Sequence, residues 1–192
     1  MGEKKTIDIP KGTRYLSELE GFELPSGIVD KELTGCGATT LALTDSHPTI
    51  LASPRVALVK NKARQFPPLQ SFVVQAGVYK EDVRKYINEC ARKGVVPKVI
   101  TTYDSLGKIS SCLTDEERMT FRLVVDEFHN ILNDSTFKAL VEMAVLEECQ
   151  KYSHVTYLSA TPMLEKYIES IGQFRARKWL RGPSSPISQK YC

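Results

Sequence analysis

The stretch FRLVVDEFHN, residues 121–130, decides how the rest of the chain is interpreted. Its first half is a nearly continuous run of apolar residues, which is typical of a strand buried on both faces of a parallel sheet. Two adjacent carboxylates, Asp126 and Glu127, follow directly after this run. The sequence therefore predicts a buried strand that ends in two acidic side chains, which are candidates for metal binding and proton transfer.

Apolar runs of strand length alternate with helical patterns along the chain, which favours an α/β fold with a mainly parallel sheet covered by helices. Helices are expected over residues 79–93 and 137–152, where apolar residues recur every three or four positions. Gly94 is a natural end for the first helix, and Thr114 followed by Glu117 is a capping box that begins another. Strands are expected over residues 27–33, 49–52, 71–75, 98–102, 122–126 and 154–159, and a last helix over residues 161–172.

The composition is that of an ordinary globular protein. With 192 residues, 42% hydrophobic and 26% charged, the chain can bury one good core, since single domains usually hold roughly 100–200 residues. The five cysteines form no CxxC pair, which argues against zinc and redox-couple sites and indicates reduced thiols. No apolar segment approaches the ~18 residues that a membrane span requires. We therefore expect a cytoplasmic protein that has no contact with a membrane.

Basic residues are unevenly distributed, although the formal net charge is only +3. Residues 46–80 and residues 173–192 contain no acid, and each segment holds several lysines and arginines. Two local positive surfaces are therefore plausible. The alternative is that both runs are ordinary solvated faces.

A glycine-rich turn follows the first expected strand, because residues 34–40 read TGCGATT before an apolar LAL segment. A strand, a glycine-rich turn and a helix N-terminus form a phosphate-binding geometry, since glycine lets backbone N–H groups approach the anion. The complete pattern GxxxxGK[ST] needs Gly at position 32 and Lys at position 38. This chain has Glu32 and Ala38 there, whereas Thr39 stands at the position of the magnesium-binding hydroxyl. Taken alone, the segment also fits an ordinary strand-to-helix turn.

In order and spacing, the motifs resemble those of the first RecA-like motor domain of superfamily 2 helicases and translocases, particularly those with a DEAH-type box. The resemblance covers roughly residues 27–172 and implies a three-layer RecA-like P-loop NTPase fold. Residues 1–26 would then be an N-terminal segment, and residues 173–192 a basic tail or a linker to a second domain. TGCGATT resembles motif I, ASPRVALVKNK (52–62) motif Ia, ITTYDSL (100–106) motif Ib, DEFH (126–129) motif II and SAT (159–161) motif III.

The resemblance implies ATP and Mg²⁺ as ligands. Asp126 would hold Mg²⁺ through water beside Thr39, and Glu127 would orient and deprotonate the attacking water. His129 would link the nucleotide site to a partner motor domain, although a hydrogen-bonded surface histidine is the alternative. The ATP phosphates would lie against Thr34, Gly35, Cys36, Gly37, Ala38, Thr39 and Thr40.

Two further groups of residues take roles by the same resemblance. Ser159, Ala160 and Thr161 would couple the nucleotide state to the grip on nucleic acid, although the hydroxyls also fit a helix N-cap. The Ia and Ib segments would hold the DNA or RNA backbone through phosphate contacts that do not depend on sequence. The candidates for these contacts are Ser53, Pro54, Arg55, Lys60, Lys62, Thr102 and Tyr103.

The chain departs from the family pattern at two places: the phosphate-binding lysine of motif I and the residues that contact the adenine base. Losing one preorganised donor such as a lysine at position 38 typically costs on the order of 3 kcal/mol, or about a hundredfold or more in rate. Lys31 could reach the site from outside the motif, but we expect an ordinary surface lysine. The glutamine motif is missing, since no glutamine precedes Gln65, and Arg14 and Tyr15 are candidates for base contact by position.

Three classes of function remain open. In the first, the chain is one motor half of an ATP-dependent helicase or translocase and is inactive in unwinding without a second RecA-like domain in the same chain or a partner subunit. In the second, it is a degenerate, non-hydrolysing nucleic-acid-binding module, and in the third a structural or regulatory docking domain. The presence of Asp126, Glu127, Ser159 and Thr161 favours the first class over the third, whereas Ala38 and Glu32 favour the second. Whether the chain is an enzyme stays open. Motors of this kind resemble phage or mobile-element replication proteins, which would act in the host cytoplasm.

Overall fold

The structure, a computed structural model, describes residues 3–31, 35–54, 71–133, 139–160 and 176–181. These residues form one sheet of eight strands in the order β1-β8-β2-β7-β6-β3-β5-β4, and every pairing is parallel. The strands are β1 (Glu3–Asp8), β2 (Gly27–Asp30), β3 (Thr49–Ser53), β4 (Phe72–Val74), β5 (Lys98–Thr102), β6 (Arg122–Val125), β7 (His154–Ser159) and β8 (Ala176–Arg181).

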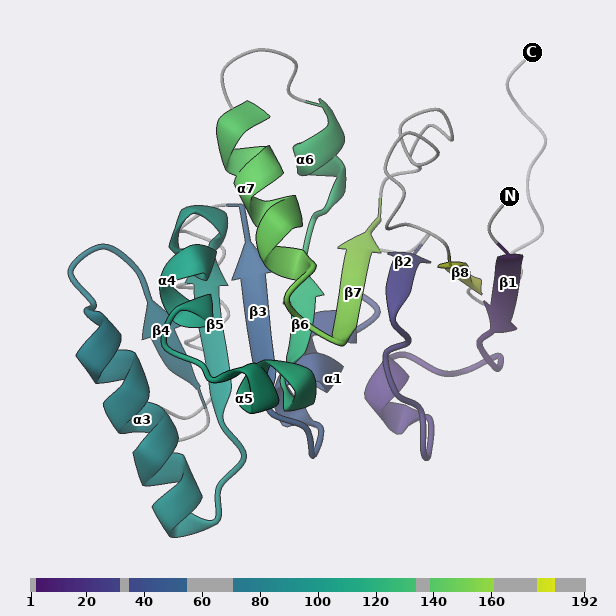
Figure 1. Ribbon diagram of the computed structural model, residues 1–192. Helices are drawn as coiled ribbons and strands as arrows, with labels where there is room; N and C mark the ends of the chain where they lie inside the picture. Colours follow the sequence, from purple (N-terminus) through teal and green to yellow (C-terminus); the bar gives the residue numbers. More distant parts are fainter. Residues whose placement is uncertain (1–2, 32–34, 55–70, 134–138, 161–175, 182–192) are drawn as a thin grey trace.

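Helices cover both faces of the sheet. The described helices are α1 (Ala38–Thr44), α3 (Lys80–Lys93), α4 (Leu106–Ser110), α5 (Asp115–Thr120), α6 (His129–Asn133) and α7 (Ala139–Cys149), with short 3-10 turns η1 (Leu16–Glu18) and η2 (Tyr103–Ser105). Figure 1 shows α3, α4, α5 and α7 in front of the sheet and α1 behind it. No helix in the described ranges is long and apolar enough to cross a bilayer.

Alternate residues of the interior strand β6 enter different cores, as expected for a strand buried on both faces. Leu123 and Val125 of β6 join the core under α3, α4 and α7. Val124, between them, joins the core that contains Leu41 of α1 and Leu16 of η1. The molecule is therefore a three-layer α/β structure, which confirms the fold class that the sequence predicts.

The helix signals in the sequence are confirmed where the structure describes them. α3 ends at Gly94, which has a φ of 63° as its C-cap. At the start of α5, the Glu117 N–H donates to Thr114 Oγ1 at 3.2 Å, and the Thr114 N–H donates to Glu117 Oε2 at 2.8 Å. The helix expected over residues 161–172 lies outside the described residues.

All strands expected from the sequence are present, and β1 and β8 are additional. β8 lies between β1 and β2 in the sheet, so residues 176–181 form a strand of the same sheet. The sequences of β1 and β8 contain no long apolar run, so they give no strand signal. Their parallel pairing is made by backbone N–H and C=O groups, which do not depend on the side chains. The sheet thus extends beyond residues 27–172 on both sides, and the division of the chain at those positions stays a prediction.

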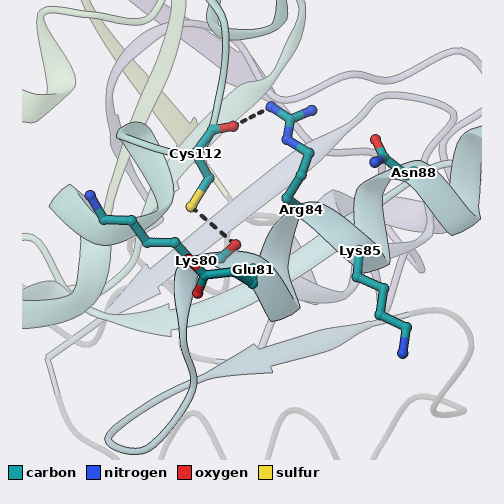
Figure 2. A pocket seen from close by; sticks show the side chains of 6 residues that line it. All are labelled: Lys80, Glu81, Arg84, Lys85, Asn88 and Cys112. Atoms are coloured by element: carbon teal, nitrogen blue, oxygen red, sulfur yellow. Dashed lines mark hydrogen bonds between the residues drawn. The ribbon is translucent and has the colours of Figure 1, made fainter.

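Arg84 connects the front helices. Its Nη1 and Nη2 atoms donate to Glu117 Oε1 and Oε2, each at 2.7 Å, and it also donates to the Cys112 carbonyl. Arg84 lines an open pocket of about 560 Å³, and Figure 2 shows its side chain among the others that line it. Because its guanidinium is held by these partners, we interpret Arg84 as a link between α3 and α5. The pocket is lined by Lys80, Glu81, Arg84, Lys85, Asn88 and Cys112.

Replacing Arg84 with methionine is expected to lower the free energy of unfolding by about 1 kcal/mol at pH 7, because the ion pair is partly screened by solvent. The hydrogen bond from Arg84 lowers the pKa of Glu117 below its ordinary value of 4.5. A depressed carboxyl pKa stabilises the folded state above the unfolded pKa, and this contribution is lost as pH falls through the folded pKa. Urea unfolding from pH 7 to pH 3 should show the two proteins converging below about pH 4.5. A difference that is constant with pH would contradict this role for the pair.

Candidate functional site

The acidic pair lies at the carboxyl end of β6, in the centre of the sheet (Figure 1). The Asp126 N–H donates to the Ala52 carbonyl at 2.8 Å, which continues the pairing of β6 with β3. The Tyr103 hydroxyl donates to the Asp126 carbonyl at 2.6 Å. Burial raises the pKa of Tyr103, so this hydroxyl keeps its proton and its donor role. Asp126 itself is 2% exposed.

Glu127 occupies a strained turn directly after Asp126. Its φ is 57°, and no other described residue except glycine has a positive φ. The Asn130 N–H and Nδ2 both donate to the Glu127 carbonyl, at 2.9 and 3.0 Å. Such left-handed backbone at a non-glycine residue costs of order 1–3 kcal/mol and is concentrated at functional sites. The turn separates the two carboxylates and leaves the Glu127 side chain 31% exposed.

Lys31 contacts both carboxylates from the end of β2. Its Nζ lies 3.3 Å from Asp126 Oδ1 and 4.0 Å from Glu127 Oε1, and its side chain is only 10% exposed. The Lys31 N–H donates to the Ser159 carbonyl at 2.7 Å. Since β7 lies between β2 and β6, this side chain reaches across the end of β7. The expectation of an ordinary surface lysine was therefore wrong, because the sheet order places the end of β2 close to the acidic pair.

His129 joins the acidic turn to the end of β7. Its Nδ1 lies 3.4 Å from Glu127 Oε2 and 3.3 Å from Ser159 Oγ. The Phe128 N–H also donates to the Leu158 carbonyl, at 2.8 Å. His129 is half-buried, with 19% of its side chain exposed, and both interpretations of its role stay predictions. DEFH and the first residue of SAT are thus in direct contact, while Thr161 lies outside the described residues.

The glycine-rich turn lies against the N-terminal segment. Gly37, with a φ of 80°, caps α1, and a Cβ added there would lie 3.3 Å from two atoms of the Tyr15 side chain. The Leu16 N–H donates to the Cys36 carbonyl at 2.9 Å. Ala38 is buried, at 3% exposure. Of the other turn residues, Gly35 has a φ of 76°, Thr39 is half-buried, Thr40 is exposed, and Thr34 lies outside the described residues.

The candidate nucleic-acid contacts divide into buried and undescribed residues. Ser53 and Thr102 are paired at the ends of β3 and β5, and both are buried. Tyr103 is also buried and supports Asp126 instead. All three side chains are thus buried in this structure, and their contact with nucleic acid stays a prediction. Pro54 is half-buried, and Arg55, Lys60 and Lys62 lie outside the described residues.

The oxygen atoms at the acidic pair suit a Mg²⁺ ion that is coordinated both by the protein and by a phosphate group. Mg²⁺ prefers oxygen ligands, keeps several waters and is usually held by one or two carboxylates together with substrate phosphates. Asp126 offers a buried carboxylate whose charge Lys31 balances. Within the described ranges, no three His, Cys, Asp or Glu residues cluster as a metal site. Asp126 would therefore hold Mg²⁺ together with a phosphate ligand.

Comparison with known proteins bears on the family and the fold of the chain. The model of the DEAD/DEAH box helicase family matches residues 34–169, and a search of the curated proteins found no significant match. The solved helicase domain of Pyrococcus furiosus Hef is 16% identical with a TM-score of 0.54, and the alignment covers 84% of this chain and 36% of that one. The DUF1998 helicase MrfA is 18% identical with a TM-score of 0.53, and the shares are 83% and 28%.

This chain thus spans well under half of the length of either structure, 36% and 28%. At these identities, the two structures show the shared fold. The family model, in contrast, matches most of the sequence, including the acidic motif and SAT. The chain belongs to the DEAD/DEAH box helicase family and has the fold of its RecA-like N-terminal motor domain.

Proposed function

We propose that this domain binds Mg·ATP and the backbone of DNA or RNA as the first motor half of a helicase or translocase. The observation that carries the proposal is the contact of Asp126 and Glu127 with Lys31, and of Glu127 with His129, at the carboxyl edge of the sheet. Open α/β sheets bind their ligands at this edge. Membership of a helicase family supports the same assignment.

Each residue of the acidic turn has a distinct proposed role. Asp126 would hold Mg²⁺, which neutralises phosphate charge when it is bound. Glu127 would orient a water molecule and accept its proton, since it keeps a partly exposed carboxylate. His129 would keep that carboxylate in place through its contact at 3.4 Å and would transmit its position to Ser159. The nucleotide phosphates would lie along Gly35 to Thr39.

A second RecA-like domain, in the same protein or in a partner subunit, would complete the motor. The chain covers 36% of the Hef structure and 28% of the MrfA structure, which supports this proposal. We expect negligible unwinding of a tailed duplex by these 192 residues alone. The cytoplasmic location and the phage or mobile-element origin stay predictions.

A degenerate, non-hydrolysing nucleic-acid-binding module is the second candidate, and Ala38 favours it. Such a module would bind single strands in a salt-sensitive way that Mg·ATP leaves unchanged. The motor half would instead change its affinity for nucleic acid when Mg·ATP binds, since allosteric coupling is reciprocal between the two ligands.

Calorimetric titration of ATP into the chain tests the proposal. We expect saturable binding that requires Mg²⁺, because Asp126 supplies a metal-binding carboxylate. Asp126→Asn should weaken the Mg²⁺-dependent binding by about tenfold or more. Asp104→Asn makes the same chemical change at an exposed residue of η2 and should leave the binding unchanged. Absence of binding by the unaltered chain, or equal effects of the two substitutions, would contradict the proposal.

A further inference from the structure

Position 38 lacks the lysine of the phosphate-binding motif, and the described part of the chain offers another cation at the acidic pair. We propose that Lys31 supplies to the nucleotide phosphates the positive charge that position 38 lacks. This inference rests on the proposed function, because it assigns a role within that nucleotide site. It is carried by the burial, position and contacts of Lys31.

The burial of Lys31 requires an explanation. Lysine is rarely buried unless its ammonium is paired, because removing the charge from water is costly. Lys31 is 8% exposed as a residue, and its ammonium lies within 4.0 Å of both carboxylates. The end of β7 fixes the backbone of this residue through the bond from the Lys31 N–H to the Ser159 carbonyl. The chain thus holds a positive charge at the point where phosphate charge would have to be balanced.

The ion pair with Asp126 fits a position that Lys31 occupies before nucleotide binds. A lysine ammonium is a point charge on a flexible stem, so it can exchange one anionic partner for another by side-chain rotation. When Asp126 serves as a metal ligand, its carboxylate is less available to Lys31, and two cations at one carboxylate repel each other. Lys31 would then turn to the phosphate oxygens, the other anionic groups of the occupied site.

Ala38 and Lys31 belong to the same strand-turn-helix segment, and Lys31 offers the positive charge that Ala38 lacks. Ala38 is 3% exposed and packs in the core that contains Leu16 and Val29. A small apolar side chain therefore fits at position 38, while the cation comes from the end of the preceding strand. Lys98 is the other buried lysine among the described residues. It stands at the start of β5 and pairs with Asp45, so it belongs to the opposite edge of the parallel sheet.

The test is the affinity for Mg·ATP of the unaltered chain and of Lys31→Met, measured by calorimetry. We expect the substitution to weaken binding about 10- to 100-fold, the range for losing a charge-assisted hydrogen bond. Lys85→Met is the matched control, because it makes the same chemical change at an exposed position of α3, and it should leave the affinity unchanged. Thermal unfolding without nucleotide shows whether each variant is folded.

A second variant separates phosphate contact from structural support. Lys31→Arg keeps a positive charge at the end of β2, and we expect it to bind Mg·ATP about tenfold or more tightly than Lys31→Met. A folded Lys31→Arg variant that binds Mg·ATP no more tightly than Lys31→Met would assign Lys31 a structural role and overturn the inference.

The remaining outcomes are also decisive. Binding by the unaltered chain that Lys31→Met leaves unchanged would overturn the role of Lys31 and leave the proposed function standing. Tighter binding of Mg·ATP by Lys31→Met would show that the Lys31 side chain obstructs the nucleotide site, and it would also overturn the inference. No binding by the unaltered chain would instead remove the proposed function, and the role of Lys31 with it.

Discussion

Lys98→Met is expected to lower the free energy of unfolding by about 3–5 kcal/mol, the usual effect of removing one partner from a buried ion pair. Lys98 Nζ lies 2.6 Å from Asp45 Oδ1, and the two side chains are 4% and 14% exposed. The same ammonium donates to the carbonyls of Ala42 and His47, at 2.9 and 2.6 Å, and to Thr49 Oγ1 at 3.1 Å. Burial lowers the pKa of Lys98 and the Asp45 carboxylate opposes this shift, so the charge depends on these partners.

Urea unfolding at pH 7 measures this loss. Lys93→Met is a suitable control, because Lys93 also makes a 2.6 Å ion pair, with Glu89, but the two side chains are 44% and 43% exposed. Exposed pairs contribute roughly 0–1 kcal/mol, so the control should be nearly neutral. Similar effects of Lys98→Met and Lys93→Met would contradict a stabilising role for the buried contacts of Lys98.

Glu127→Gln is expected to slow hydrolysis of ATP by about 10²- to 10⁴-fold, which is the contribution of a positioned general base. Binding of Mg·ATP should be retained, because the amide keeps the size of the side chain and Asp126 is untouched. Single-turnover hydrolysis, with the chain in excess over labelled ATP, measures the rate even if it is slow. Glu116→Gln, a change on α5 outside the acidic turn, serves as the control.

The assignment of Glu127 as the general base requires that Glu127→Gln slows ATP hydrolysis much more than Glu116→Gln does. A Glu127→Gln rate within about threefold of the unaltered rate would exclude Glu127 as the base, given the usual size of general-base effects. Loss of both binding and hydrolysis would assign Glu127 to ligand binding instead. Only slow hydrolysis with intact binding agrees with the proposed role.

The interior strands could be predicted from the sequence because burial on both faces requires continuous apolar runs. RLVV of β6 and TILAS of β3 are such runs, and the strands expected around residues 122 and 49 are present. β1 and β8 could not be predicted in this way, since EKKTID and ARKWLR mix charged with apolar residues. Their place in the sheet is set by backbone pairing with neighbours that are distant in sequence.

The candidate site was predictable in its motifs and less so in its contacts. Asp126 and Glu127 stand at the strand end that the apolar run indicates, and Ser159 lies beside His129. The burial of Lys31 depends on strand order, which no local pattern contains. Tyr103 could face either the core or solvent at the end of β5, and it packs beneath Asp126. The left-handed backbone of Glu127 likewise follows from the turn into α6, not from a preference of glutamate.

The most direct test of a nucleotide site at this edge of the sheet is a crystal structure of the chain with Mg²⁺ and a non-hydrolysable ATP analogue. We expect the triphosphate against residues 35–39, the metal beside Asp126, and Lys31 Nζ closer to a phosphate oxygen than to the carboxylate that it contacts at 3.3 Å without nucleotide. A nucleotide bound elsewhere on the domain would contradict the site. An ordered triphosphate with Lys31 still paired to Asp126 would contradict the role of Lys31.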